Sequence, residues 1–288
     1  MKAMAAAWLA LGAATSAAAS SVPEPLVAPF VAEYDVRYGR IPGGTSRTVL
    51  ARAGGDWVID TVVIASGIAR IIAPGTIRQR SEFRFEAGIP RPLRYSFDDG
   101  TKRTDRDVNL EFDWRAGRVR GMAEDVSVDV ALVPELQDAA TMTVLVTARL
   151  RAGREPGTIA MIEKDQVKHY RHTMLRREKL ATALGELDTV VYVSTREGSS
   201  RETITWHAPG LGFAVVQAQQ LVKGKLGFHT RIRSYQPGIE GDAPLRFLQV
   251  RGSVTPFWPW YLPPRSLYEV SHTSSDSKNS NCATPSFA

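Results

Sequence analysis

The sequence predicts a mostly β fold: a large antiparallel sheet, closed or half closed into a barrel, with one main α-helix packed across it. Three observations predict this fold. Apolar and polar residues alternate in many short segments, turn residues separate those segments, and a single stretch has helical spacing. The chain has 288 residues, of which 43% are hydrophobic and 23% are charged, so it can bury a sizeable core.

The first 19 residues have the pattern of a signal peptide. Lys2 supplies a positive charge, residues 5–14 form a short apolar run, and Ala17 and Ala19 give the small-x-small pattern that precedes cleavage. This run is too short to span a bilayer comfortably, and no later stretch has the length of a transmembrane helix. We therefore expect a periplasmic or secreted protein without a transmembrane helix. The Pro-rich residues 20–29 are expected to form a linker.

The strand pattern begins at Phe30. In FVAEYDVRY, which ends at Tyr38, the aromatic residues lie on one face and the charged residues on the other. In residues 77–86 the odd-numbered residues are uncharged and the even-numbered residues are charged, which favours a soluble barrel over a transmembrane one. Similar patterns predict strands at residues 57–65, 93–97, 108–114 and 126–130, and further on at 158–163, 167–175, 187–193, 204–206, 213–222 and 226–235.

Turn residues separate these strands. Pro42, Gly43 and Gly44 predict one turn, the Asp-Asp-Gly of residues 98–100 predicts another, and the Lys-Gly-Lys of residues 223–225 predicts a hairpin. We place the β-rich domain at residues 30–237.

The main helix is predicted at residues 134–152. Pro134 suits a first helical position, and Asp138 lies near the positive end of the helix dipole. Arg149 and Arg151 lie in the last turn, and Gly153 can end the helix.

The last segment, residues 238–288, shows neither period and is rich in Pro, Ser and Asn. It predicts a disordered tail. The alternative is an aromatic motif around Trp258 and Trp260 that binds an envelope protein partner. The single cysteine, Cys282, cannot form an intrachain disulfide.

His207 is a weak catalytic candidate. Strand alternation places it on the face opposite Trp206, where a lone histidine is expected to lie on the surface. Gly210 and Gly212 resemble the start of a dinucleotide-binding loop, but no third glycine or helix follows. No catalytic residue and no cofactor is predicted.

No metal site is predicted either. His169 and His172 are separated by an odd number of positions, so on one strand they point to opposite faces. Asp98, Asp99, Asp105 and Asp107 could bind calcium or perform acid–base chemistry, but basic residues interrupt the run and a hairpin turn explains it better.

The formal net charge of +6 favours acidic partners such as anionic lipid head groups. No nucleic-acid-binding motif is present, so no nucleic-acid partner is expected.

Four segments together resemble one family, the exported bacterial domain of unknown function 3108 (DUF3108). They are FVAEYDVRYGRIPGG, LQDAAT, TALGELDTVVYV and ITWHAPGLGFAVVQAQQ, and the resemblance covers about residues 30–237. It implies an exported β-rich domain and brings no catalytic residues.

Two classes of function remain. The first is a non-enzymatic envelope protein that binds an apolar or amphipathic ligand, such as a lipid, inside the β shell, if the interior is open rather than filled. The second is an envelope hydrolase with a polar cleft near Asp98, Asp99 and His207, and a purely structural interaction protein is a further alternative. The expected ligand-binding residues are Phe30, Tyr34, Tyr38, Phe83, Phe85, Arg78, Arg80 and Arg84.

Overall fold

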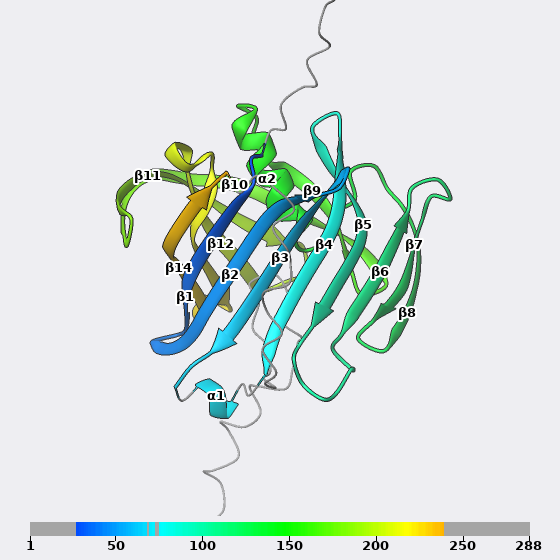
Figure 1. Ribbon diagram of the computed structural model, residues 1–288, viewed down its shortest axis with the longest axis horizontal. Helices are drawn as coiled ribbons and strands as arrows, with labels where there is room; N and C mark the ends of the chain where they lie inside the picture. The colour runs from blue at the N-terminus through cyan, green and yellow to red at the C-terminus, as the bar shows by residue number, and fades with distance from the viewer. Residues whose placement is uncertain (1–26, 68, 73–74, 239–288) are drawn as a thin grey trace, which may run out of the picture.

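The computed structural model describes residues 27–67, 69–72 and 75–238. The expected signal peptide, most of the linker, and the tail with Trp258 and Trp260 lie outside these residues. The described chain is mostly β, as predicted, and folds as one curved sheet around a single main helix (Figure 1).

The sheet has 14 antiparallel strands in the order β8-β7-β6-β5-β4-β3-β2-β1-β14-β13-β12-β11-β10-β9. Nearly all neighbours are consecutive in the chain, and β1 with β14 joins the two halves. The strands are β1 (Phe30–Tyr38), β2 (Ile41–Ala53), β3 (Asp56–Ala65), β4 (Thr76–Glu86), β5 (Ile89–Asp98), β6 (Val108–Asp113), β7 (Arg118–Ala123), β8 (Val126–Ala131), β9 (Gly157–Glu163), β10 (Gln166–Thr182), β11 (Gly185–Arg196), β12 (Arg201–Ala208), β13 (Ala214–Val222) and β14 (Lys225–Pro237).

The barrel is half closed. Its edge strands, β8 and β9, are not paired with each other in the described chain. The segment between β8 and the helix connects the two sides through Gln137. The backbone of Gln137 bonds to Ala160 and Ile162 of β9, and its side-chain amide donates to the Pro90 carbonyl of β5. Gln137 is fully buried, so this connection is shielded from water.

The main helix, α2 (Thr141–Arg151), is shorter than predicted. Residues 134–140 are not helical, because Gln137 forms a parallel bridge with Met161 of β9 and Glu135 has a φ of 56°. A long-range contact therefore overrides the helical spacing of this segment. Asp138 accepts hydrogen bonds from the backbone N–H groups of Ala140 and Thr141, which satisfies two donors at the start of the helix.

The end of α2 is as predicted. Gly153 has a φ of 67°, which is accessible to glycine, and its N–H bonds to the Leu150 carbonyl. The described residues include two further short helices, α1 (Ala69–Ile72) and the 3-10 turn η1 (Pro209–Leu211). In the ranges that the structure covers, no helix is long and apolar enough to cross a membrane.

The alternation predicted for residues 77–86 is confirmed. Ile77, Gln79, Ser81 and Phe83 are all buried in β4, whereas the charged residues between them reach solvent in part. Helix α2 packs on the side that these residues face, and Met142 and Leu145 are fully buried there.

Two local predictions were wrong. Gly43 and Gly44 lie within β2 rather than in a turn, and the chain reverses at Gly39, whose φ is 53°. A Cβ on Gly44 would lie 2.0 Å from the Ile64 carbonyl oxygen, so the glycine permits close strand approach. Strand β7 was missed because its pattern is short and contains Gly121, where a Cβ would lie 2.0 Å from the Asn109 carbonyl oxygen.

Candidate ligand chamber beside helix α2

A chamber of ≈ 90 Å³ lies between α2 and the inner face of the sheet. One stripe of the helix contributes to it, together with strands from both halves of the sheet. Most of its surface is contributed by carbon atoms. The lining residues are Val27, Ala28, Phe30, Tyr34, Ser46, Thr48, Ile59, Thr61, Gln79, Ala140, Thr143, Thr147, Arg151, Thr205, Leu211, Gly212, Ala214, Val215, Ala218, Thr230 and Tyr235.

Aromatic side chains border one part of the chamber. Phe30 stacks on Tyr235 with ring centroids 5.5 Å apart and an interplanar angle of 26°. The hydroxyl of Tyr34 donates to the Val215 carbonyl at 3.0 Å, and burial raises the pKa of Tyr34. Tyr34 is therefore a neutral, fixed part of the wall.

Seven serine and threonine side chains line the chamber, yet its surface is mainly carbon. Threonine explains this difference, because it can present its methyl group while its hydroxyl bonds to a neighbour. Thr48 and Thr61 do so across β2 and β3, with their hydroxyl oxygens 3.0 Å apart. Ser46 differs: its hydroxyl is buried and has no partner among the described residues.

This difference predicts opposite effects for two similar substitutions. Thr48→Val should lower the free energy of unfolding by about 1–2 kcal/mol, because it leaves the buried Thr61 hydroxyl without its partner. Ser46→Ala should leave the stability unchanged or raise it by up to about 1 kcal/mol, because no bond is lost. Urea unfolding of both variants measures the contrast. Equal losses would show that Ser46 has a partner in solution.

A buried polar group lies near the N-terminal end of α2. The hydroxyl of Ser81 donates to the Asp138 carboxylate at 2.6 Å, and the Gln79 amide donates to the Tyr95 hydroxyl at 2.9 Å. Asp138 is fully buried, and burial raises the pKa of its carboxyl group to about 6 despite these bonds. These contacts join the helix start to β4 and β5. The sequence pattern predicts Asp138 near the helix start, whereas its burial depends on contacts with strands distant in the chain.

Some of the aromatic residues predicted to bind a ligand line the chamber, and the others do not. Phe30 and Tyr34 line it. Phe83 and Phe85 instead pack edge to face against each other and around Trp57, in a filled part of the core. Tyr38 is 41% exposed and does not line the chamber.

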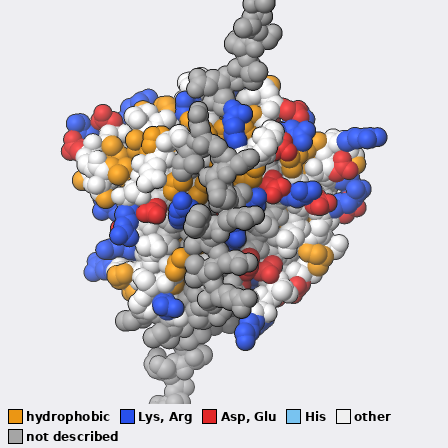
Figure 2. Space-filling view, viewed as in Figure 1, with side chains coloured by type: hydrophobic (Ala, Val, Ile, Leu, Met, Phe, Trp, Pro, Cys, Tyr) orange, Lys and Arg blue, Asp and Glu red, His pale blue; other side chains and the backbone are white. Residues whose placement is uncertain are grey.

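The predicted arginines lie away from the chamber and have acidic partners. Arg78 bonds to Asp60 at 2.6 Å, and Arg80 pairs with Glu82 at 3.0 Å. Arg84 pairs with Asp56 at 3.5 Å. On the face shown in Figure 2, basic and acidic side chains are likewise interspersed. These ion pairs account for the charged row of β4 without a ligand.

The expectation that His207 lies on the surface was wrong. His207 points away from Trp206, as alternation predicts, but it is only 1% exposed. Its Nδ1 donates to the Phe213 carbonyl, its Nε2 lies 2.9 Å from the Thr205 hydroxyl, and its ring packs edge to face on Tyr192. Burial lowers the pKa of His207 to about 4. Trp206, on the opposite face of β12, is also buried, and its indole N–H donates to Glu178 of the long strand β10.

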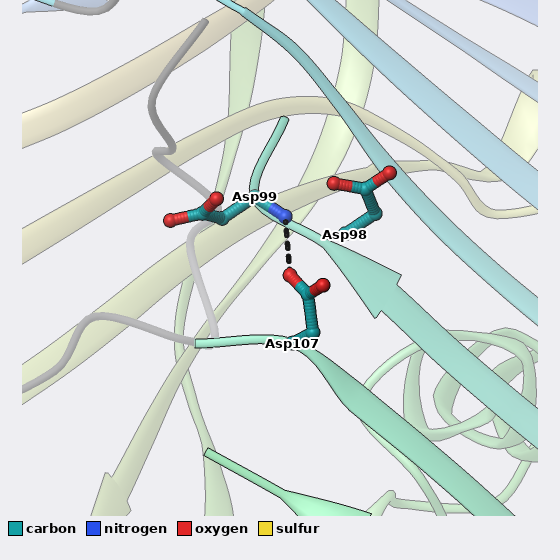
Figure 3. Close-up of side chains that lie close together, drawn as sticks. All are labelled: Asp98, Asp99 and Asp107. Atoms are coloured by element: carbon teal, nitrogen blue, oxygen red, sulfur yellow. Dashed lines mark hydrogen bonds between the residues drawn. The ribbon is translucent and has the colours of Figure 1, made fainter. Parts of the chain in front are cut away.

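Three aspartates, Asp98, Asp99 and Asp107, lie close together where β5 ends and β6 begins (Figure 3). Carboxylate oxygens of Asp98, Asp99 and Asp107 all lie within 4.8 Å of one another, which makes this the group of described residues that could hold a cation. Asp107 accepts a bond from the Asp99 N–H, and burial raises the pKa of Asp107. Arg106 lies 3.9 Å from the buried Asp99 and offsets its charge. Neither these aspartates nor His207 lines the chamber.

The fold and the chamber define a class: a half-closed β shell with one internal helix and a narrow internal chamber beside it. The chain belongs to the family described as "Protein of unknown function (DUF3108)", whose model matches residues 33–224, so the predicted resemblance is confirmed. A search of the curated proteins gives no match.

Solved structures of low sequence identity are similar to this chain. A β-barrel-like protein of the domain of unknown function DUF1849 from Brucella abortus is 8% identical, with a TM-score of 0.46, over 74% of this chain and 98% of its own. A proposed lipoprotein from Parabacteroides distasonis is 8% identical, with a TM-score of 0.30, over 74% and 97%. A proposed exported protein with a YmcC-like fold from Bacteroides fragilis is 10% identical, with a TM-score of 0.30, over 74% and 97%.

Proposed function

We propose that this protein is an exported, non-enzymatic envelope protein that binds an apolar or amphipathic ligand in the chamber beside α2. The observation that carries the proposal is the chamber itself, which has a mainly carbon surface and lies beside the hydrophobic core that α2 forms with the sheet. A preformed apolar cavity with few polar groups is typical of a small-molecule binding site. The signal-peptide pattern of residues 1–19 supports export.

The shape of the chamber limits what can enter it. Its volume is ≈ 90 Å³, whereas an apolar cavity of about 150 Å³ accommodates a benzene ring. Its helical lining runs from Ala140 to Arg151, which spans about 16 Å at the rise of an α-helix. This volume favours an unbranched chain over a ring system, and a chain longer than a few carbons must extend beyond the chamber or widen it.

Blocking the chamber tests this proposal. Ala218 is buried in the chamber wall, and Ala218→Leu should weaken ligand binding by roughly tenfold or more, because the added atoms occupy the space of the chain. Gln219 follows it on the opposite face of β13, so Gln219→Leu is the matched control and should bind as the unchanged protein does. Native mass spectrometry of protein purified from its own envelope, followed by titration with decan-1-ol, measures retention and affinity.

The outcome that would contradict the proposal is equal ligand retention by both variants. Circular dichroism and thermal unfolding of Ala218→Leu must first establish that it folds. If it does not, Thr230→Val, which keeps the side-chain volume and removes a chamber hydroxyl, provides a second measurement. That variant should bind an apolar chain at least as tightly as the unchanged protein, and weaker binding would count against an apolar ligand.

The hydrolase alternative has less support. A general base must reach its substrate, and His207 is buried with both ring nitrogens engaged. Asp98 ends β5 and Asp99 follows it, and their carboxylates accept hydrogen bonds from the backbone N–H groups of residues 100 and 101. The structural-partner alternative depends on Trp258 and Trp260, which lie outside the described residues.

A further inference from the structure

The chamber is almost free of charge. Among its lining residues Arg151 is the one with a charged side chain, and no carboxylate lines the chamber. Arg151 is the last residue of α2 and is exposed to solvent on one side. An anionic ligand group at this position would bind the Arg151 guanidinium without competition from a neighbouring carboxylate of the lining.

Within the described chain Arg151 forms no ion pair or side-chain hydrogen bond. The preceding arginine of the same helix differs, since Arg149 bonds to Glu135 and to the Pro156 carbonyl. Arg78, Arg80 and Arg84 of β4 also have acidic partners. The arginines predicted to contact an anionic head group are therefore engaged, whereas the arginine that lines the chamber is available.

The surroundings of Arg151 hold it at the chamber. Gly212, which ends the η1 turn with a φ of 62°, lies so close that a Cβ there would be 2.9 Å from Nη1 of Arg151. The side chain of Tyr235 is near enough for Arg151 to lower its pKa, although burial has the larger effect and raises it. Glycine at position 212 thus leaves room for the guanidinium group beside the backbone.

The helix aligns this cation with the rest of the chamber. Ala140, Thr143, Thr147 and Arg151 follow one another at intervals of three or four residues, so they form one stripe along α2. Arg151 lies at the C-terminal end of the stripe. Gln79, which is uncharged, lies near the other end with Tyr95 and Asp138. The residues that line the chamber are therefore cationic at one end and uncharged elsewhere.

We infer that the ligand is a single-chain amphiphile with one anionic head group, a carboxylate or a phosphate monoester, which binds Arg151 while its hydrocarbon chain lies along the stripe of α2. This inference rests on the proposed function and adds the charge of the ligand and its orientation. A guanidinium group binds either anion through paired N–H donors, so the two head groups share one chemistry.

Three ten-carbon probes that differ only in head group test the inference: decanoate, decan-1-ol and decyltrimethylammonium. Isothermal titration of the full chain should give decanoate an affinity about tenfold higher than that of decanol, because a charged hydrogen bond is added. The cationic probe should bind more weakly than both. Decyl phosphate should behave as decanoate does.

Arg151→Gln removes the charge and keeps a hydrogen-bonding side chain. It should reduce the affinity for decanoate about tenfold and leave the affinity for decanol unchanged. Arg154→Gln removes an equal charge from an exposed residue that does not line the chamber, and it should leave both affinities unchanged. Butanoate and inorganic phosphate should bind far more weakly than decanoate, because each buried methylene contributes roughly a fourfold gain.

The failures are distinguishable. If decanol and decanoate bind equally and both are lost in Ala218→Leu, the chamber binds a neutral chain and the inference about Arg151 is wrong. If inorganic phosphate binds as tightly as decyl phosphate, Arg151 belongs to a free-anion site and the inference also fails. If no probe binding responds to Ala218→Leu, the proposed function itself is wrong.

Discussion

Lowering the pH from 7 to 4 is expected to cost the protein about 3 kcal/mol of stability through His207 alone. The folded pKa of His207 is about 4 because the ring is buried, with a smaller contribution from the nearby His172, whereas the ordinary pKa of histidine is 6.5. Between pH 4 and pH 6.5, His207 binds a proton in the unfolded chain but stays neutral in the folded chain. The stability is therefore complete above pH 6.5, falls as the pH falls, and levels off near pH 4.

The substitution His207→Gln isolates this effect. At pH 7 it should lower the free energy of unfolding by about 1–3 kcal/mol, because Thr205 and the Phe213 carbonyl lose part of their bonding. The free energy of unfolding of the unchanged protein, taken relative to that of the variant, should be about 3 kcal/mol lower at pH 4 than at pH 7. Urea unfolding at both pH values measures it.

His169 provides the control for His207. It lies on the opposite face of β10 from the buried His172 and is exposed. His169→Gln should preserve the pH dependence of the unchanged protein. A constant stability difference between the protein and His207→Gln at pH 4 and pH 7 would show that His207 is accessible to protons in the folded state.

Asp138 is expected to act in the opposite direction. Burial raises the folded pKa of its carboxyl group to about 6, above its ordinary value of 3.8. In this interval the folded chain holds a proton that the unfolded chain releases. The contribution of Asp138 to stability is fully present below pH 3.8 and is lost as the pH rises to about 6, a change of about 3 kcal/mol.

Two variants separate the charge of Asp138 from its hydrogen bonds. Asp138→Asn keeps an oxygen that can accept from the N–H groups of Ala140 and Thr141 and removes the titration. Relative to this variant, the unchanged protein should gain about 2 kcal/mol when the pH falls from 7 to 4, because the unfolded chain is already partly protonated at pH 4. Asp138→Ala should cost about 3–5 kcal/mol at pH 7, because the helix loses its cap and Ser81 loses its partner.

The readout for Asp138 is again urea unfolding at both pH values. A thermal transition that is equally cooperative in both variants would serve as the folding control. If the difference between the unchanged protein and Asp138→Asn does not depend on pH, Asp138 keeps an ordinary pKa and is more hydrated than its burial indicates.

The local pattern of the sequence determined the fold class. The alternation in β4 identified the buried face correctly, because successive side chains of any strand point to opposite sides. Twelve of the strands follow from such patterns. Strand β2 was missed because Pro42, Gly43 and Gly44 indicated a turn, and β7 was missed because Gly121 interrupts its short pattern. The sequence also determined the end of α2 through Gly153, and the family through segments that extend along most of the domain.

Only the tertiary structure decided which polar groups have partners. The start of α2 depends on the bridge between Gln137 and Met161, and the burial of His207 depends on Tyr192 and Phe213, which come from neighbouring strands and turns. The sequence pattern suggested that the arginines of β4 bind a ligand, whereas in the structure they form ion pairs with Asp56, Asp60 and Glu82. Arg151 gave no sequence signal beyond a cation at a helix end, because pairing and exposure depend on atoms distant in the chain.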